Sequence, residues 1–519
     1  MKKYLLASAL FFLFAPFLAA SVTLGPVPEG EPRSTFWSVE INGQTAGVLT
    51  ARTADPPFEN YDYGGEYAIV SVDADEPITL KIRDLYCRHL IFSDSIPGRL
   101  RGPGSLGPGQ RENSSGSDLT GRAADSLTIR PASLGLSANK CGDDTFEITV
   151  TKPCQFSVEI DGRVHPLLVF VNEPEKNIPT KDENTIVFGP GIHEPKDGCI
   201  TLGDHQTLYL AAGAVVRCGV EIHGENVRIC GRGMIDSSPW KWREGPTPFV
   251  ISIKDSKNVS IEGITIRGAS HWTIVPVNSD DVTIHNVKIC GGRVQNDDGI
   301  NPCNSRRVAI SDCFIRTDDD CVAIKGLGNE MGNCEDITVE RTVFWCDRAR
   351  IVLMGHESRA PYMRRITFRD CDIIHAQTRN FLMEPGEEMR LENILLENLR
   401  FEMGRENALD PDSTATDPDT GAIRFDIDTQ AKENWLFVGR PAVNQYMQTQ
   451  SPGHIRDCTI RNITVTGPIS YAGILFSGAD AEHQTSGLTI ENVTLFGEKM
   501  PPESPRLHLG DFLENVTVQ

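Results

Sequence analysis

A short pattern that returns throughout the second part of the chain constrains the fold more than any other feature. From about Thr207 onward, each copy is a strand of alternating apolar residues, a turn around Asn, Asp or Gly, and a second short strand. A repeat of this size cannot bury its apolar face alone, so successive copies must stack into a solenoid. The equivalent apolar positions, 23 to 32 residues apart, are Val227, Val259, Val282, Val308, Ile337, Ile366 and Ile394.

Among solenoids, a right-handed parallel β-helix fits this pattern best. Leucine-rich repeats share the period, but the sequence lacks their LxxLxLxxN signature and their helical segments. The alternative is an antiparallel sandwich built of hairpins, which the regular return of the pattern disfavours.

The chain before the repeats has a different pattern. Residues 21 to about 178 contain alternating strands separated by turn residues such as Asn42-Gly43 and Asp161-Gly162, as in a β-sandwich. The sequence therefore predicts an all-β chain in three parts. These are a signal peptide at 1–20, an N-terminal β-sandwich at 21–178 and a right-handed parallel β-helix at 179–519.

The predicted signal peptide has a short basic start, Lys2 and Lys3, followed by an apolar run and small residues at Ala19 and Ala20. We expect the protein to be secreted or periplasmic. Removing the two lysines changes the net charge from −21 to −23. Such a negative surface repels nucleic acid and anionic membranes, so we expect neither nucleic-acid binding nor membrane insertion.

Two clusters of aspartates stand close together within the repeats. The segment NDDGINPCNSRRVAISDCFIRTDDDC, at 296–321, contains NDDG and then DDDC. Asp298 precedes Asp319 by slightly less than one coil, and equivalent residues of neighbouring coils lie roughly 4.8 Å apart. We therefore expect Asp298 to lie near Asp319 and Asp320, on one face of the β-helix.

Paired carboxyls of this kind are typical of glycoside hydrolysis. A gap of roughly 6.5–9.5 Å between two carboxyl groups leaves room for the water that inverts an anomeric centre. One protonated carboxyl donates to the leaving oxygen, and a carboxylate activates the water. Because several like charges in one site cannot all ionise easily, we expect one carboxyl to stay protonated near neutral pH.

Two other interpretations of the aspartates stay open. Asp-rich turns can bind calcium, and an acidic turn can simply be solvated. Fourteen cysteines show no CxxC pairs and no metal-ligand spacing, and several lie within apolar strands, where buried free thiols are expected. We predict no metal site and no cofactor.

The segment from His271 to Gly326 resembles the catalytic core of glycoside hydrolase family 28, the polygalacturonase family, whose N-x-D-G motif is followed about one coil later by D-D-C-x-A-I. The resemblance implies a pectin-lyase-like solenoid and an inverting mechanism. It implies that Asp319 is the general acid and that Asp298 and Asp320 hold the attacking water. Asn296 stands at the first position of N-x-D-G and is a predicted substrate-binding residue.

The sequence departs from the family in two places. Arg350 stands where family 28 usually has a histidine, and the R-I-K motif that binds a uronate carboxylate is missing near 380–384. We therefore predict Arg350 as a substrate-binding residue and a substrate other than pure galacturonate. Lys325 would neutralise the carboxylates or bind a sugar hydroxyl, although a solvated lysine is an equally good interpretation.

The predicted function is a polysaccharide or oligosaccharide hydrolase that inverts the anomeric centre. A sandwich ahead of a β-helix is also similar to glycoside hydrolase family 49, the dextranases, so a glucan hydrolase is the first alternative. A polysaccharide lyase and a non-catalytic carbohydrate-binding solenoid are the others. The Asp clusters suit attack by water better than β-elimination, which uses Arg or Lys.

Overall fold

A computed structural model describes most of the chain. The described residues are 22–53, 55, 65–85, 127–160, 163–376, 379–404, 434–443, 448–468 and 472–519. The predicted signal peptide, 1–20, lies outside these ranges. Within them, no helix is both long enough and apolar enough to cross a membrane.

Two sheets form the N-terminal part, and all their strand pairs are antiparallel except β5 with β11. Inward side chains of both sheets, including Trp37, Leu80, Ile148 and Phe156, make one buried core. The first sheet contains β1 (Val22–Leu24), β4 (Leu49–Arg52), β5 (Glu66–Ala74), β7 (Thr128–Arg130), β10 (Cys154–Glu159) and β11 (Leu167–Asn172). The second contains β2 (Trp37–Ile41), β3 (Gln44–Thr45), β6 (Ile78–Asp84), β8 (Ala138–Lys140) and β9 (Thr145–Val150).

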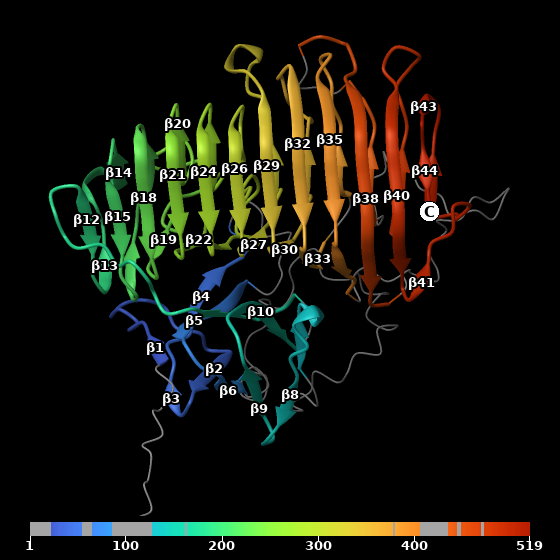
Figure 1. Ribbon diagram of the computed structural model, residues 1–519. Coiled ribbons are helices and arrows are strands. Elements are labelled where there is room, and N and C mark those ends of the chain that lie inside the picture. Colours follow the sequence, from blue (N-terminus) through green and yellow to red (C-terminus); the bar gives the residue numbers. More distant parts are fainter. Residues whose placement is uncertain are drawn as a thin grey trace, which may run out of the picture.

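The rest of the chain is a parallel solenoid whose complete coils contribute three strands each, one to each of three faces. Figure 1 shows the strands in a row that follows the sequence, from β12 on the left to β44 on the right. The first two faces are joined in one long sheet, and the third face is separate.

Strands of the first face are β12 (Thr185–Phe188), β15 (Thr207–Leu210), β18 (Glu225–Gly231), β21 (Lys257–Glu262), β24 (Asp280–His285), β26 (Arg306–Ser311), β29 (Cys334–Glu340), β32 (Tyr362–Arg369) and β35 (Arg390–Glu397). Those of the second are β13 (Gly191–His193), β16 (Ala214–Val216), β19 (Met234–Asp236), β22 (Thr265–Arg267), β25 (Lys288–Cys290), β27 (Phe314–Thr317), β30 (Val343–Cys346), β33 (Asp372–His375) and β36 (Arg400–Glu402). The long sheet continues through β38 (His454–Thr466), β40 (Thr485–Leu495), β41 (Glu498–Lys499), β43 (Leu513–Glu514) and β44 (Thr517–Val518).

Strands of the third face are β14 (Cys199–Leu202), β17 (Gly219–Ile222), β20 (Ile251–Lys254), β23 (Ile274–Val277), β28 (Val322–Ile324), β31 (Val352–Met354), β34 (Arg379–Met383), β37 (Asn434–Gly439), β39 (Ala472–Phe476) and β42 (Leu507–Leu509). Among the described residues, short 3-10 helices are η2 (Ala132–Leu134), η3 (Lys196–Gly198) and η4 (Asn329–Met331).

The register of the first face confirms the repeat that the sequence predicts. Val227 pairs with Val259, which pairs with Val282, and the ladder continues through Val308 and Ile337. These side chains are at most 1% exposed, so each coil covers the apolar face of its neighbour, as a stacked solenoid requires. The predicted fold class, a β-sandwich followed by a parallel β-helix, is confirmed.

Asn and Asp at the repeat turns have a conformational role. Asn226 and Asn258 have φ values of 61° and 54°, a left-handed conformation that Asn tolerates better than most residues. The Asn258 side-chain amide also donates to the Asn226 side-chain oxygen at 2.7 Å. These turns therefore stack in register with the strands beside them.

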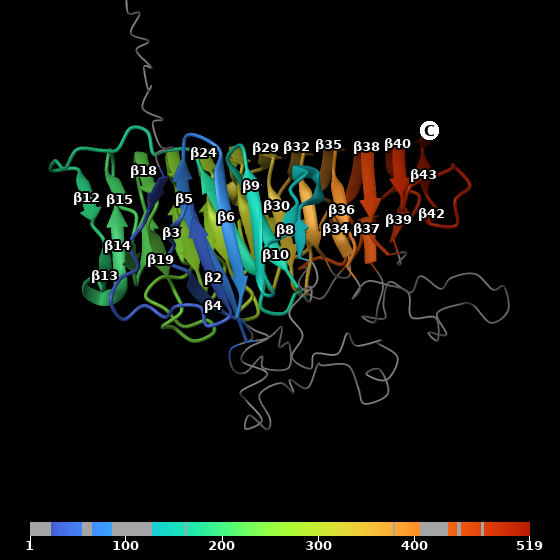
Figure 2. The ribbon, with the colours of Figure 1, turned by 90° about the horizontal axis from the view of Figure 1, so that it is seen from below.

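The N-terminal sheets pack against the second face of the solenoid, beneath its first two-thirds (Figures 1 and 2). At the centre of this interface, the buried Arg316 guanidinium lies 4.1 Å from the ring centroids of both Tyr67 and Trp345. Asp347 accepts from Arg316 at 3.0 Å. Because a buried charge is costly unless it is paired, this arrangement favours one relative position of the two parts.

The third face is interrupted once, between β23 and β28. In that coil only single bridges continue the ladder, where Ile300 pairs with Ile274 on one side and with Val322 on the other. Residues 291–299, which precede this irregular strand, make a longer turn than in neighbouring coils. This turn carries the NDDG motif.

Candidate active site

The two Asp motifs lie in the turns that lead into the third face, in adjacent coils. The backbone N–H of Gly299 donates to the carbonyl of Asp320 at 2.9 Å, which places Asp298 beside Asp320. A Cβ on Gly299 would lie 2.4 Å from the carbonyl oxygen of Cys321. Only glycine permits this approach, and the close approach brings the predicted carboxyls together.

Asp298 is buried and has two side-chain partners. Its Oδ2 accepts from the Asn301 amide at 2.8 Å and from Lys325 Nζ at 3.3 Å. Burial raises the pKa of the Asp298 carboxyl to about 6, a shift that Lys325 opposes and the charge of Asp319 reinforces. Asp298 therefore changes its charge in the weakly acidic range.

Asp320 is also buried, and its Oδ1 accepts from the backbone N–H of Arg350 at 3.2 Å. The Arg350 guanidinium lies 3.6 Å from the same oxygen. Burial, together with the charges of Asp319 and Asp298, raises the pKa of the Asp320 carboxyl to about 7, although Arg350 opposes the shift. The three aspartates are thus close enough to affect one another's ionisation.

Asp319 is the most exposed of the three, with 14% of its side chain accessible. Its Oδ2 accepts from the backbone N–H of Asn296 at 3.2 Å and from Arg348 Nη2 at 2.9 Å. Its Oδ1 accepts from the backbone N–H of Asp320 at 3.1 Å. Asp319 is therefore the member of the cluster that a large substrate could reach most directly.

Asp297, which the sequence analysis did not single out, organises both turns. One carboxylate oxygen accepts from the backbone N–H groups of Asp318 and Asp319, and the other from those of Gly292 and Arg293. Burial raises the pKa of Asp297 well above its usual range, and the charge of Asp318 adds to the shift. Asp297 therefore holds the NDDG turn against the DDDC turn. The only indication of this role in the sequence is that Asp297 is the second residue of the N-D-D-G motif.

Arg348 was also missed. Its Nε donates to Asp318 at 2.8 Å while its Nη2 contacts Asp319. Burial raises the pKa of Asp318 to about 7 against the opposing charge of Arg348. Arg348 and Arg350 thus place two positive charges within an acidic cluster. In the sequence, Arg348 and Arg350 are two residues apart in the segment DRARI, as side chains on one face of a strand are, and this spacing was the only indication of Arg348.

Lys325 is buried, so the structure does not support the interpretation of a solvated lysine. Its Nζ lies 3.3 Å from Asp298, 3.5 Å from Glu357 and 4.0 Å from the centroid of the Trp272 ring. Burial alone would lower the pKa of Lys325, but the charges of Asp298, Glu357 and Asp320 raise it above its usual range. Lys325 is therefore placed as a fixed counter-charge to Asp298.

Asn296 contacts Arg243, which lines an open hollow of about 530 Å³. Its side-chain oxygen accepts from Arg243 Nη2 at 2.9 Å and from Trp242 Nε1 at 3.3 Å. His271 lines the same hollow, and its ring forms a group with the rings of Phe249 and Trp272, whose centroids lie 5.2–5.8 Å apart and whose planes are within 8–11° of one another. A flat aromatic surface of this kind can pack against the apolar face of a sugar ring.

The segment near 380–384, where family 28 would have R-I-K, contains Glu384. His356 Nδ1 lies 2.5 Å from one Glu384 oxygen, and Arg440 Nε donates to the other at 2.9 Å. Burial alone would raise the pKa of Glu384, but its contacts with His356 and Arg440 lower it. A carboxylate at this position would repel the carboxylate of a uronic acid.

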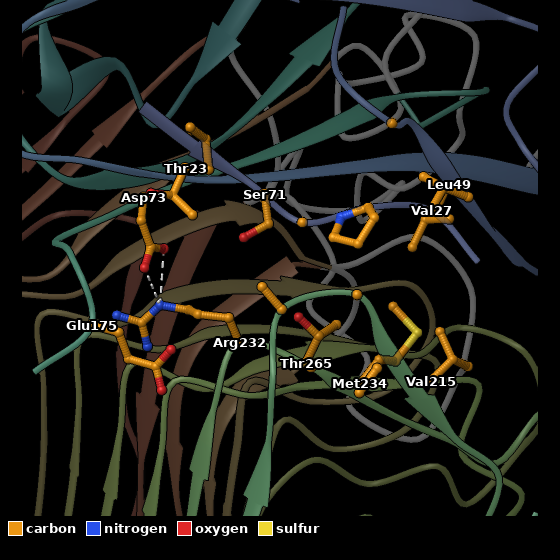
Figure 3. A pocket seen from close by; sticks show the side chains of 18 of the residues that line it. Thr23, Val27, Leu49, Ser71, Asp73, Glu175, Val215, Arg232, Met234 and Thr265 are labelled. Carbon is orange, nitrogen blue, oxygen red and sulfur yellow. Dashed lines mark hydrogen bonds and ion pairs between the residues drawn. The ribbon is translucent and has the colours of Figure 1, made fainter. Parts of the chain in front are cut away.

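A second hollow, of about 290 Å³, lies between the N-terminal sheets and the first coils of the solenoid. Figure 3 shows Asp73 facing Arg232 across it, with Glu175 nearby, and Nε of Arg232 donates to Asp73 at 2.9 Å. Its walls are mostly apolar, and they include no residue of the aspartate cluster. This hollow therefore belongs to the interface between the two parts of the chain.

The arrangement has the components of single-displacement hydrolysis. It brings together one accessible carboxyl, Asp319, and two buried carboxyls whose protons exchange between about pH 6 and 7. A site of this kind can hold a proton donor and a carboxylate at the same pH. The remaining predicted residues, Asn296, Lys325 and Arg350, all lie in contact with this cluster or beside it.

A family comparison confirms the resemblance that the Asp motifs indicate. The sequence model described as glycosyl hydrolases family 28 matches residues 216–343, which run from the end of β16 to the start of β30. The matched segment includes Asp298, Asp319, Asp320 and Lys325, whereas Arg348 and Arg350 lie beyond it.

Two curated relatives match part of the chain. A probable polygalacturonase of Vitis vinifera is 33% identical over 119 residues, which are 22% of this chain and 24% of that protein. A probable exopolygalacturonase B of Aspergillus terreus is 24% identical over 212 residues, which are 34% of this chain and 46% of that protein. The chain therefore spans between a quarter and a half of the length of these two relatives.

A solved structure resembles the whole chain. Dex49A from Penicillium minioluteum matches with a TM-score of 0.60 over 94% of both chains, at 14% sequence identity. At this identity the likeness concerns the fold alone. It agrees with the predicted architecture of a sandwich followed by a parallel β-helix.

Proposed function

We propose that the protein is a glycoside hydrolase that cleaves a polysaccharide with inversion at the anomeric carbon. The observation that carries the proposal is the meeting of Asp298, Asp319 and Asp320 in adjacent turns, where the backbone N–H of Gly299 donates to the Asp320 carbonyl and Asp319 accepts from the backbone N–H groups of Asn296 and Asp320. The family 28 match over the same coils supports it. Asp319 protonates the glycosidic oxygen, while Asp298 and Asp320 hold the attacking water.

The positions of the three carboxyls fit these roles. Asp319 is more exposed than the other two and can approach an oxygen of a bound chain. Asp298 and Asp320 lie behind it on neighbouring coils, where burial restricts access to small molecules such as water. Lys325 and Arg350 each stabilise one of them as a carboxylate, which is the form that accepts a proton from water.

We propose a neutral or partly neutral glycan as the substrate. Arg348 and Arg350, the two arginines beside the aspartates, both contact carboxylates of the cluster. Glu384 adds a negative charge where a uronate carboxylate would bind in family 28. Both observations disfavour a fully charged galacturonate chain, and they support the expectation drawn from the missing R-I-K.

The proposal is tested by incubating the protein with dextran, neutral pectic side chains, partly esterified pectin and polygalacturonate. New reducing ends without ultraviolet absorbance indicate hydrolysis, whereas absorbance by an unsaturated sugar indicates a lyase. NMR of the first product, before mutarotation, must show an inverted anomer. A retained anomer would mean a covalent intermediate and would contradict the proposed roles.

Asp319→Asn separates catalysis from binding. It keeps the shape of the side chain but removes the proton donor, so kcat should fall by about 10²–10⁴-fold while the affinity for an oligosaccharide survives. Asp197→Asn, which makes the same change at an exposed residue away from the cluster, is the matched control. Equal function of Asp319→Asn and wild type would favour a carbohydrate-binding solenoid without catalysis.

We also propose that the protein acts outside the cytoplasm, because residues 1–20 have the composition of a cleaved signal peptide. N-terminal sequencing of protein recovered from the periplasm or the medium tests this. A mature protein that still begins at Met1 would contradict it.

A further inference from the structure

A cluster of metal-ligand side chains lies where strands of the third face lead into the next strands of the first face. The aspartates, in contrast, lie in the turns that lead into the third face. Glu388, His454 and His483 each direct one potential ligand atom to a common point, and these atoms all lie within 4.8 Å of one another. We propose that this cluster binds one divalent transition-metal ion, with Zn²⁺ as the ion that its ligands fit best. This inference does not depend on the proposed hydrolase activity.

Two contacts within the cluster, each to a different oxygen of Glu388, have about the length of the ligand–ligand distance around a tetrahedral ion. His454 Nε2 lies 3.5 Å from Glu388 Oε2, and His483 Nε2 lies 3.3 Å from Glu388 Oε1. With metal–ligand bonds of about 2.0–2.1 Å, the ligand atoms of a tetrahedral zinc ion lie roughly 3.3–3.4 Å apart. Two imidazoles and one carboxylate therefore need little movement to close around an ion, and they leave a fourth position for water.

A carboxylate behind His483 fixes which nitrogen faces the cluster. Both oxygens of Asp480 contact His483 Nδ1, at 2.9 and 3.0 Å. Asp480 also accepts from the backbone N–H groups of Glu482 and His483, at 2.8 and 2.9 Å. With a hydrogen on Nδ1, the Nε2 lone pair of His483 points toward Glu388. Carboxylate–histidine–metal arrangements have this form.

The backbone that presents Glu388 is held in an unfavourable conformation. Glu387 and Glu388 have φ values of 53° and 61°, a region that costs about 1–3 kcal/mol for residues other than glycine. Contacts with the next coil maintain it, because Glu387 N–H donates to the Ser451 carbonyl and Glu388 N–H to the Pro452 carbonyl. Ser451 Oγ donates to the Glu388 carboxylate as well. Strain of this kind is concentrated at ligand sites.

The three ligands come from three consecutive coils. In the strand register His454 pairs with Arg390, two residues after Glu388, and Ile455 pairs with Thr485, two residues after His483. An ion at this point would link the β34–β35 turn, the beginning of β38 and the β39–β40 turn. Because solenoid coils are held mainly by their neighbours, such a link stabilises the C-terminal coils.

The experiment uses the full chain without a polyhistidine tag, because a tag would compete for metal. Protein treated with a chelator and dialysed is titrated with ZnCl₂ by calorimetry, and Tm is measured with and without Zn²⁺. We expect about one ion per chain and a rise in Tm of roughly 2–5 °C. Wild-type protein that binds no Zn²⁺ would overturn the proposed site. Binding without a rise in Tm would contradict the proposed link between the C-terminal coils.

Two variants and one control locate the site. The double variant His454→Gln/His483→Gln should lose the tight site, and equal binding by this variant would overturn the assignment. His223→Gln removes an exposed histidine near Glu221 on an earlier coil and should bind Zn²⁺ as wild type does. Asp480→Asn keeps all three ligands and should weaken Zn²⁺ binding about 10–100-fold; unchanged affinity would contradict the geometry proposed for His483, even if the double variant fails to fold.

Discussion

Replacing Lys325 by Met should shift the pH dependence of catalysis. Lys325 Nζ lies 3.3 Å from Asp298, and its charge lowers the pKa of that carboxyl against the effect of burial. At about 4 Å, the interaction of two unit charges is about 1 kcal/mol in bulk water and about 4 kcal/mol at an effective dielectric constant near 20. Since one pKa unit corresponds to about 1.4 kcal/mol, losing the ammonium group should raise the pKa of Asp298 by about one to three units.

The sign of the effect on activity follows from the role of Asp298. A carboxylate that holds the attacking water must be ionised, so activity is present above its pKa and lost as the pH falls through it. In the wild type, activity should fall as Asp320, which shares this role, gains a proton near pH 7 and as Asp298 gains one near pH 6. With a pKa near 8, Lys325→Met would have only about 1% of Asp298 ionised at pH 6, against about half in the wild type. We therefore expect kcat/KM of the variant to be about 50-fold below that of the wild type at pH 6, and this deficit to shrink as the pH rises through 8.

The assay is kcat/KM from pH 4 to 10, with reducing ends as the readout on the best substrate of the panel. Lys325→Arg retains the charge and should keep the wild-type profile, and Lys257→Met removes an exposed lysine of β21 as a matched control. Circular dichroism at each pH separates unfolding from loss of catalysis. If Lys325→Met were equally impaired at every pH, the counter-charge explanation would be wrong and Lys325 would bind the substrate directly.

Three further predictions concern stability. The pKa of Asp320 is raised from 3.8 to about 7, so the folded state retains a proton that the unfolded state releases, and stability falls as the pH rises between these values. Asp320→Asn should therefore stabilise the protein more at pH 8 than at pH 4, with a difference in unfolding free energy of at most about 4 kcal/mol, measured as a larger rise in Tm at pH 8. An equal change in Tm at both pH values would refute this. Gly299→Ala should lower both Tm and activity, at a cost of about 1–3 kcal/mol, because its Cβ would lie 2.4 Å from the Cys321 carbonyl oxygen. Tyr67→Phe should cost about 1–3 kcal/mol in thermal unfolding, since the buried Gly291 carbonyl would lose the 2.8 Å bond from the tyrosine hydroxyl, whereas Tyr362→Phe, at the exposed contact with Arg390, should change little.

The sequence predicted the solenoid well because its evidence is periodic. An inward Val or Ile recurs once per coil, and stacking is the only way to bury all of these side chains. The same periodicity predicts that Asp298 lies beside Asp320, because positions one coil apart become neighbours in space. Both predictions depend on a unit that repeats along one axis, and such a repeat is visible in a single sequence as a regular spacing of similar residues.

Contacts between residues that the repeat does not relate to one another could not be predicted in the same way. Asp297 reaches four backbone N–H groups of two turns, and backbone donors have no signature in a sequence. The Arg316 stack depends on Tyr67, which is far away in the chain and belongs to another part of the fold. Glu388 and His483 are also distant in sequence and show no ligand spacing, so the sequence predicts no metal site there.

The sandwich and the carboxyl cluster are linked by a short series of contacts, which suggests why the two parts occur together. The Tyr67 hydroxyl donates to the Gly291 carbonyl, and the next residue, Gly292, donates its N–H to Asp297. Asp297 in turn accepts from the backbone N–H groups of Asp318 and Asp319.

Burying several carboxyls with raised pKa values in adjacent turns opposes folding at neutral pH, because their charged forms are poorly solvated. Turns held only by their own coils would relieve this repulsion by moving apart. The apolar contacts between Phe170 of β11 and Phe314 of β27 lie on the same interface and hold the second face in place. The sandwich therefore acts on the site as a fixed support for turns that carry more negative charge than the solenoid alone would keep together.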